Sequence, residues 1–264
     1  MNAKKRFGQN FLAAPEIAAR IVSVAGVRSG EHVLEIGPGH GILTEQLLAA
    51  GAKVTAIELD RELIAGLRHL PITLIEGDAL RIGLPVVDRV VANLPYNIAT
   101  AVLIRLLEAR VPMSLMFQRE VAERLIAVPR THAYGSLSIH VQLRSRPEIA
   151  LTLPPAAFRP QPNVHSTVVR FTPIEADFAG VDPGAFARVV RLGFSQRRKT
   201  IANSLGSGIG REVAHRVLAD ADIDPIARAE TIDLAGWRRL AAAVRDAGVD
   251  ATKVVEPADE TDAL

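Results

Sequence analysis

The chain has 264 residues and contains no cysteine. Disulfides, thiolate metal ligands and cysteine nucleophiles are therefore excluded, and so is methylation of a pyrimidine carbon through a cysteine adduct. No run of about 18 uncharged apolar residues occurs, so the sequence gives no sign of a membrane-spanning helix. The first ten residues do not form an apolar signal segment either. These absences predict a protein located in the cytoplasm, with no membrane partner.

Aromatic residues are also scarce, at 4% of the chain, whereas 48% of the residues are hydrophobic. A chain of this length and composition can bury a full core in one large domain and still form a smaller one. The formal net charge is only +2, but residues 246–264 carry six acids and one lysine. We expect this tail to be disordered, and the positive excess of the remaining chain suits a polyanionic partner.

Short β-branched runs alternate with amphipathic stretches from about residue 31 onward. Strands are expected at 32–36, 53–58, 72–76, 86–92 and 113–117, and helices at 42–50, 61–69, 98–109 and 119–127. This alternation predicts a parallel, doubly wound α/β sheet. Two further strands, at 149–153 and 166–171, have no helix between them, which predicts an antiparallel edge strand. Only helices are expected beyond residue 180, at 183–193, 196–205, 211–219 and 234–246.

The segment Asn93-Leu94-Pro95-Tyr96 directly follows one of the expected strands. The Asn93 side-chain oxygen and the Leu94 carbonyl, restrained by a proline that fixes φ, can present two acceptors to one amino group on a planar base. Tyr96 offers a flat face for that base. The alternative is a turn that ends the strand, with the tyrosine packed in the core.

A glycine-rich segment at 35–41, with the sequence EIGPGHG, follows the first expected strand of this alternation and opens a helix. Gly37 and Gly39 allow a tight turn and a close approach of a ligand to the backbone. Their spacing differs from the dinucleotide pattern, and Glu35 stands where a pyrophosphate would be repelled. The segment therefore favours a cofactor with a positively charged group.

Two more acids end the next strands of the expected sheet. Glu58 can accept hydrogen bonds from both hydroxyls of a ribose, and Asp78 can accept one from the amino group of an adenine. The alternatives are a helix-capping acid for Glu58 and an Asx turn for Asp78. Acids at the carboxyl ends of three successive strands favour an adenosine that carries a sulfonium over NAD.

Together these segments resemble the rRNA adenine-N6,N6-dimethyltransferase family, and its bacterial small-subunit branch most of all. The resemblance runs from residue 4 to about residue 245, through 6–12, 35–39, 58–60, 77–80, 93–98, 118–124, 134–138, 154–162, 194–200 and 228–231. The segments at 93–98 and 194–200 are the most specific. The chain departs from the family at Ala13-Ala14, where an acid is common, and at His165, where aspartate is usual.

The resemblance implies a class I S-adenosylmethionine-dependent methyltransferase with a Rossmann-like, mostly parallel seven-stranded sheet in residues 1–178. A small all-helical domain that binds RNA and the ribosome would follow at 179–246, and the acidic tail at 247–264. The implied cofactor is S-adenosylmethionine, with Glu58 on its ribose and Asp78 on its adenine. The residues expected to bind it are Gln9, Asn10, Leu12, Gly37, Gly39, Glu58, Asp78, Ala79 and Asn93.

The expected catalytic residues are Asn93, Leu94, Tyr96 and Phe158. An aromatic amino group is a poor nucleophile, because its lone pair is delocalised into the ring. Acceptors on Asn93 and Leu94 would bind the two N6 hydrogens and localise that pair, while fixed dipoles stabilise the developing positive charge. Tyr96 and Phe158 would stack on the two faces of an adenine drawn out of its RNA stack; the alternative for Phe158 is burial. No metal and no covalent intermediate is needed.

Arg197, Arg198 and Lys199 are expected to bind RNA phosphates. Other basic residues that can extend this footprint are Lys4, Lys5, Arg6, Arg144 and Arg191. The alternative is an ordinary charged helix surface. The substrate that the resemblance implies is a pair of adjacent adenines in the 3′-terminal hairpin loop of small-subunit (16S) rRNA, so the expected partner is the small ribosomal subunit. No oligomer is implied.

Four other functions remain open on the sequence. The large-subunit resistance methyltransferases share the chemistry but more often have isoleucine where this chain has Leu94. DNA adenine methyltransferases lack a helical segment like the one around residues 197–199. An assembly factor that binds immature subunits is compatible with the basic surface, and a nicotinamide dehydrogenase is disfavoured by the glycine spacing.

Overall fold

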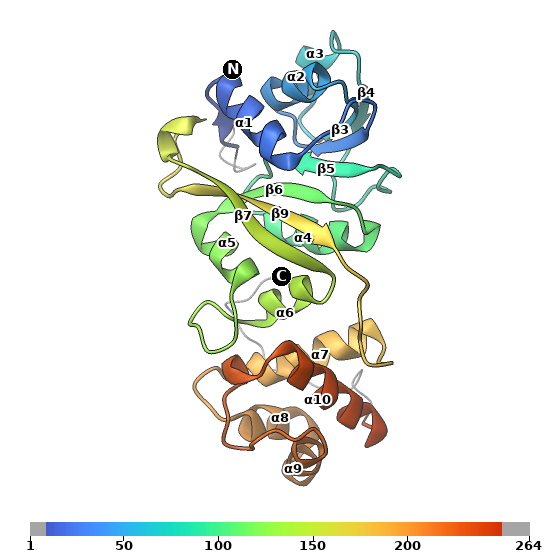
Figure 1. Ribbon diagram of the computed structural model, residues 1–264, viewed down its shortest axis with the longest axis vertical. Coiled ribbons are helices and arrows are strands. Elements are labelled where there is room, and N and C mark those ends of the chain that lie inside the picture. The colour runs from blue at the N-terminus through green and yellow to red at the C-terminus, as the bar shows by residue number, and fades with distance from the viewer. Residues whose placement is uncertain (1–8, 250–264) are drawn as a thin grey trace. The chain divides into compact units, whose positions relative to one another are not determined.

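The computed structural model describes residues 9–249 (Figure 1). The predictions for Lys4, Lys5 and Arg6 and for the acidic tail from residue 250 onward lie outside the described residues. By its internal contacts the chain divides into two compact units. The first comprises the chain up to Ala122 together with Arg146–Pro173, and the second comprises Glu123–Ser145 and the chain from Ile174 onward. The segment 123–145, which the sequence placed with the sheet, thus packs with the helices that follow residue 174.

The first unit is built on a seven-stranded sheet. Its strands are β2 (His32–Ile36), β3 (Lys53–Glu58), β4 (Thr73–Glu76), β5 (Arg89–Ala92), β6 (Met113–Gln118), β7 (Ser145–Leu153) and β9 (Ser166–Pro173). They lie in the order β4-β3-β2-β5-β6-β9-β7. Strands β2 to β6 pair in parallel, and β9 pairs antiparallel with β6. The predicted mostly parallel sheet is therefore confirmed, with β7 as its edge.

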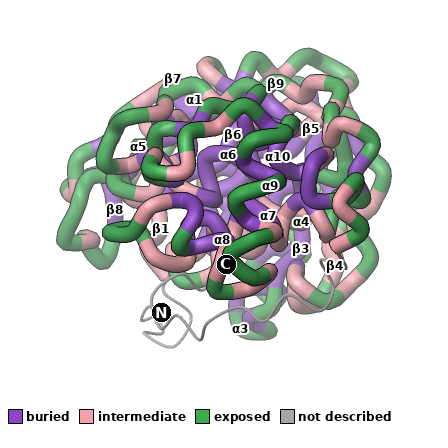
Figure 2. Tube along the Cα trace, turned by 90° about the horizontal axis from the view of Figure 1, so that it is seen from below, coloured by how far each residue is buried: buried purple, intermediate pink, exposed green. Residues whose placement is uncertain are grey.

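Helices α1 and α2 cover one face of this sheet. The helices that begin in this unit are α1 (Pro15–Ala25), α2 (Ile42–Ala49), α3 (Arg61–Leu67), α4 (Ala99–Leu106) and α5 (Arg119–Ile126). Apolar side chains of α1 and α2, such as Ile21 and Leu47, pack with Val33, Val54 and Val91 of the strands. Figure 2 shows the resulting burial of central strands such as β6. Helix α1 was not predicted from the sequence, although Pro15 suits the first turn of a helix.

A short two-stranded sheet joins two segments of the first unit that lie far apart in the sequence. Strand β1 (Phe11–Leu12) pairs antiparallel with β8 (Phe158–Arg159), and the Ala13 amide donates to the Ala157 carbonyl at 2.8 Å. We call residues 9–13 the N-terminal strap. Short 3₁₀ helices lie at Leu107–Ala109 and Pro155–Ala157.

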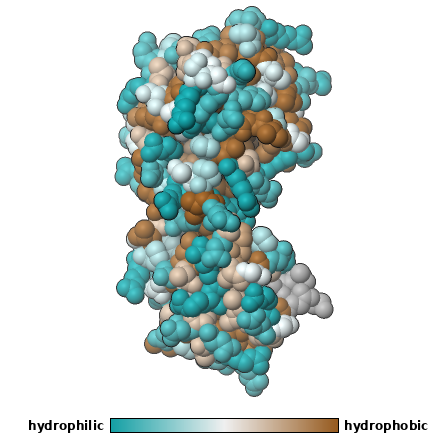
Figure 3. Space-filling model, turned by 45° about the vertical axis from the view of Figure 1, so that its right-hand side comes forward, coloured by the Kyte–Doolittle hydropathy of each residue, from teal (hydrophilic) through white to brown (hydrophobic). Residues whose placement is uncertain are grey.

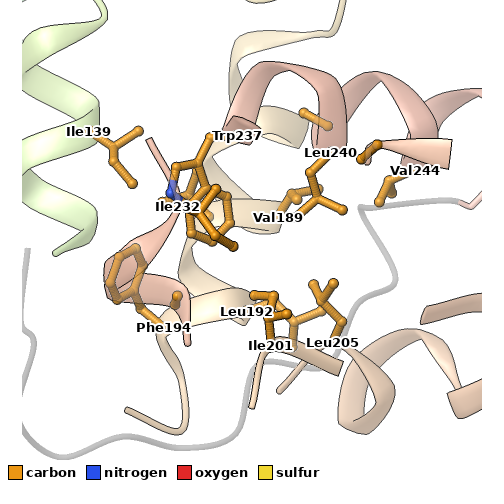
Figure 4. Close-up of a cluster of buried hydrophobic side chains, with 14 of the residues drawn as sticks. Ile139, Val189, Leu192, Phe194, Ile201, Leu205, Ile232, Trp237, Leu240 and Val244 are labelled. Carbon is orange, nitrogen blue, oxygen red and sulfur yellow. The ribbon is translucent and has the colours of Figure 1, made fainter. Parts of the chain in front are cut away.

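The second unit is helical, as predicted. It contains α6 (Ser136–Gln142), α7 (Pro183–Phe194), α8 (Ile201–Ile209), α9 (Arg211–Asp220) and α10 (Leu234–Asp246), with a 3₁₀ turn at Ala229–Thr231. Its core surrounds Trp237, which stacks on Phe194 at a ring distance of 5.4 Å (Figure 4). The Tyr134 hydroxyl donates to the Ile232 carbonyl at 3.1 Å. This contact explains why the segment 123–145 belongs to the helical unit.

One predicted helix begins later than expected. A helix was predicted at 196–205, but α8 begins at Ile201, and the Thr200 side chain before it accepts a hydrogen bond from the Asn203 amide. Residues 195–199 form the turn between α7 and α8. Such a capping threonine ends the turn and starts the helix.

Hydrophilic side chains are spread over the face shown in Figure 3, with apolar patches between them. Within residues 9–249, every helix is too short or too polar to cross a bilayer.

Candidate active site

A cavity of about 270 Å³ lies at the carboxyl ends of four neighbouring strands. Its lining comes from the segments that follow β2, β3, β4 and β5 and from the N-terminal strap. Ligands of open parallel sheets bind at this position, where the strand order reverses. Eight of the nine residues expected to bind the cofactor line it, namely Gln9, Asn10, Gly37, Gly39, Glu58, Asp78, Ala79 and Asn93.

Glu58 is a buried carboxylate that is held by backbone amides. Its Oε1 accepts hydrogen bonds from the amides of Leu59 and Asp60 at 2.8 and 2.9 Å, and its Oε2 accepts one from Gly39 at 3.3 Å. Burial raises the pKa of Glu58, and the three amide donors oppose that shift. Because two carboxylate oxygens offer about four acceptor positions, the side chain keeps capacity for a hydroxyl of a ligand.

Asp78 follows β4 and lines the same cavity. Its Oδ1 accepts from the Leu80 amide at 2.9 Å, and its Oδ2 lies 3.4 Å from Nε of Arg81. The Asx turn that the sequence offered as the alternative is therefore present, and it fixes the carboxylate at the wall of the cavity.

Apolar side chains complete the lining. Those from the strand ends, the following loops and helix α3 are Ile36, Ile57, Leu59, Leu63, Leu80 and Ile98. An apolar lining of this kind suits a planar base, and single hydrogen-bonding groups then fix the orientation of the base. These residues were not predicted from the sequence, because an aliphatic residue at a strand end gives the same pattern whether it faces a ligand or the core.

Asn93 is oriented by the strap. Its Nδ2 donates to the backbone carbonyl of Asn10 at 2.9 Å. A carbonyl can only accept, so the amide nitrogen faces Asn10 and the oxygen Oδ1 lies at the other end of the side-chain amide. Leu94 is buried and, with Pro95, lines the cavity next to Asn93. The two residues expected to supply acceptors for the amino group thus line the cavity side by side in the sequence.

Tyr96 and Phe158 do not line the cavity. Tyr96 is half-buried, and its hydroxyl is hydrogen-bonded to Oγ of Ser166. Phe158 is 0% exposed and packs in the core of the first unit. A ring without accessible surface cannot stack on a base, so in this arrangement Phe158 is a core residue, and the stacking predicted for it is not seen.

Leu12 and Glu35 also lie outside the main cavity. Both line a smaller hollow beside it, together with His40. Leu12 is otherwise a core residue. Burial raises the pKa of Glu35 to about 8, while a hydrogen bond from Thr44 Oγ1 at 2.7 Å opposes the rise. The side chain is therefore mostly protonated at neutral pH, and it does not present the negative charge to the cofactor that the sequence suggested.

The predicted RNA-binding residues, Arg197, Arg198 and Lys199, are exposed in the turn before α8. Arg197 is also anchored, because its Nη2 donates to the carbonyl of His132 at 2.9 Å. Of the other basic residues named for the footprint, Arg144 lies over the Phe178 ring at 4.8 Å. Within the described part of the chain, no group of three or more histidines, aspartates and glutamates is arranged to hold a metal ion.

The lining suits S-adenosylmethionine. Gly37 adopts φ 68°, which favours glycine over other residues, so the turn after β2 leaves backbone rather than a side chain at the cavity wall. Fixed carboxylates stand at the end of β3 and after β4, and apolar side chains line the cavity with them. This donor and acceptor set matches the hydroxyls and the adenine of that cofactor.

Comparison with known proteins agrees with this site. Residues 1–242 match the family model described as ribosomal RNA adenine dimethylase. The chain is 43% identical over 259 residues to a ribosomal RNA small subunit methyltransferase A of Cereibacter sphaeroides, covering 91% of this chain and 92% of that protein. It is 41% identical to the protein of the same name from Acidithiobacillus ferrooxidans, covering 93% and 96%.

Solved structures show the same likeness. A dimethyladenosine transferase from Plasmodium falciparum has a TM-score of 0.79 and 27% identity, over 90% of this chain and 98% of that one. The 23S rRNA methyltransferase ErmE has a TM-score of 0.64 and 26% identity, over 89% and 100%. The dehydrogenase and DNA methyltransferase alternatives are thereby set aside. The chain belongs to the ribosomal RNA adenine dimethylase family of S-adenosylmethionine-dependent methyltransferases.

Proposed function

We propose that the protein transfers methyl groups to N6 of two adjacent adenines in the 3′-terminal hairpin loop of small-subunit (16S) rRNA, giving N6,N6-dimethyladenosines. It would do so in the cytoplasm, during the biogenesis of the small subunit. The similarity to small-subunit methyltransferases over more than nine tenths of the chain supports this substrate. The observation that carries the chemistry is the anchored Asn93 amide beside the cofactor cavity.

Bound S-adenosylmethionine supplies an electrophilic methyl group. Glu58 would accept hydrogen bonds from the ribose of the cofactor, and Asp78 would accept one from its adenine amino group. The apolar lining of the cavity would exclude water from the adenine of the cofactor. Gln9 and Asn10 of the strap close the remaining side, next to Asn93.

The target amine is activated by acceptors alone. The Asn93 Oδ1 and the Leu94 carbonyl accept its two hydrogens, which localises the nitrogen lone pair and aims it at the methyl group. Because these acceptors are fixed before reaction, they stabilise the positive charge that develops on nitrogen without reorganising. The proton that the nitrogen then loses passes to solvent. Tyr96 supplies a stacking face for the base.

A second transfer at the same nitrogen follows the same logic. The monomethylated amine keeps one hydrogen, which one acceptor can hold, and it keeps its lone pair. The second reaction then needs only that the pocket admit a methyl group. Dimethyladenosine is therefore the expected final product.

The RNA is held by the helical unit. Arg197, Arg198 and Lys199 are exposed in one turn, where they can neutralise successive phosphates. Anchoring of Arg197 to the His132 carbonyl stiffens this turn.

The test is transfer of labelled methyl from S-adenosylmethionine to small and large ribosomal subunits that lack the modification. The RNA is then digested to nucleosides. Dimethyladenosine in the small subunit alone is the expected result. Label in the large subunit would move the protein to the resistance branch, and binding to small subunits without label would favour a pure assembly factor.

A further inference from the structure

The side-chain amide of Asn93 has two ends of opposite hydrogen-bonding character, an oxygen that accepts and an NH₂ that donates. Only one orientation serves the proposed chemistry. With the oxygen toward the target amine, the amine's hydrogens find an acceptor. With the amide turned by 180°, two NH₂ groups would face each other, and the lone pair of the amine would be drawn toward the amide instead of the methyl group.

One contact selects the productive orientation. Nδ2 of Asn93 donates to the Asn10 carbonyl at 2.9 Å, across 83 positions of sequence. The turned amide would place Oδ1 against that carbonyl, which puts two acceptors together. Asn10 therefore stabilises the orientation that leaves Oδ1 for the substrate.

The Asn10 carbonyl is itself held in place by the strap. Phe11, the next residue, packs at a centroid distance of 4.3 Å on the His40 ring, and β1 pairs with β8. The Phe11 ring also lies close to Gly39, since a Cβ atom added at Gly39 would stand 2.8 Å from that ring. The strap thus rests on the same glycine turn that lines the cofactor cavity.

We infer that Asn10 is a positioning residue for methyl transfer: its backbone carbonyl, held by the Phe11 ring on Gly39 and His40, sets the orientation of the Asn93 amide. This inference rests on the proposed function of Asn93. Asn10 also connects cofactor binding with the activation of the amine, because Gln9 and Asn10 line the cavity for the cofactor. A strap in place is then a condition for an Asn93 that is ready to react.

A double-mutant cycle tests this link. Phe11→Ala loosens the strap, and Asn93→Asp keeps an acceptor oxygen but removes the donor that the Asn10 carbonyl binds. Single-turnover transfer is measured at saturating cofactor, so that any weaker cofactor binding appears in KM and not in the rate. Phe11→Leu, which keeps an apolar side chain on Gly39, serves as the conservative rescue.

Phe11→Ala should slow transfer about tenfold in the wild-type background, the worth of one hydrogen bond. In the Asn93→Asp background it should change the rate little, since no donor remains to be positioned. Phe11→Leu should recover most of the rate. Equal slowing in both backgrounds would overturn the inference, because the strap would then act without Asn93.

A second readout does not depend on activity. The side-chain NH₂ of Asn93, assigned in ¹⁵N spectra by its loss in Asn93→Asp, should exchange slowly with water and become fast-exchanging in Phe11→Ala. An unchanged signal would contradict the inference even if transfer were too slow to measure. A wild type that makes no dimethyladenosine would instead refute the proposed function, while leaving the amide signal to decide on the contact.

Discussion

Replacement of Glu35 by glutamine should stabilise the protein by an amount that grows with pH. Glu35 is 1% exposed, and burial raises its pKa from 4.5 to about 8. A carboxyl with a raised pKa binds its proton more tightly in the folded state, so the fold loses stability as pH rises between these two values. Glutamine copies the neutral acid in shape and keeps an oxygen for the hydrogen bond from Thr44, but it does not ionise.

The expected size follows from the two pKa values. Because this carboxyl ionises more readily in the unfolded chain than in the folded one, the wild type loses about 2 kcal/mol of stability by pH 6, about 3 kcal/mol by pH 7 and about 4 kcal/mol by pH 8. Below about pH 4 both states are protonated and the difference should vanish. Glu35→Gln should therefore gain roughly these amounts over the wild type.

Urea unfolding of both proteins at these pH values, monitored by far-UV circular dichroism, measures the difference in their free energies of unfolding. The unfolding transition of the first unit is the one that should shift, because Glu35 lies on β2. A matched control is Glu45→Gln on α2, an exposed acid, which should show little pH dependence. A gain that stays constant from pH 4 to pH 8 would refute the argument that Glu35 is held protonated.

Three further predictions concern the site and the helical unit. Glu58→Ala should abolish measurable cofactor binding in calorimetry while binding to small subunits persists; joint loss would show that the two functions are not separable. Gly193→Ala should destabilise the helical unit by about 1–3 kcal/mol in thermal unfolding, because its Cβ would lie 2.4 Å from the Trp237 ring, and an unchanged transition would contradict this packing. Replacing residues 197–199 with alanine should weaken subunit binding. The slope of log affinity against log salt concentration should fall by the equivalent of up to about three phosphate contacts, and an unchanged slope would place the RNA elsewhere.

The sheet was predictable because its strands carry local signals. Runs such as His32–Ile36 and Lys53–Glu58 are rich in β-branched and apolar residues, and the helices between them repeat with the helical period. The acids and glycines of the cavity were also predictable, since they stand directly after these strands. Sequence order alone brings them together once the sheet is parallel.

The strap was not predictable in the same way. Strand β1 has two residues and pairs with two others that lie almost 150 positions away, so no periodicity marks it. Phe158 is part of that pairing, and Asn10, whose carbonyl Asn93 contacts, directly precedes β1. Likewise α8 begins at a threonine cap, which the sequence contained and the helix prediction passed over.

The central claim is that the Asn93 side chain activates the amine, and single-turnover methyl transfer by Asn93→Ala tests it most directly. Gln46→Ala, which removes an amide on α2 outside the cavity, is the control. Removing one preorganised group of this kind should slow transfer by about 10²–10³-fold, with small-subunit binding retained and Gln46→Ala unaffected. A rate for Asn93→Ala within a few-fold of the wild type, at saturating cofactor, would contradict the account.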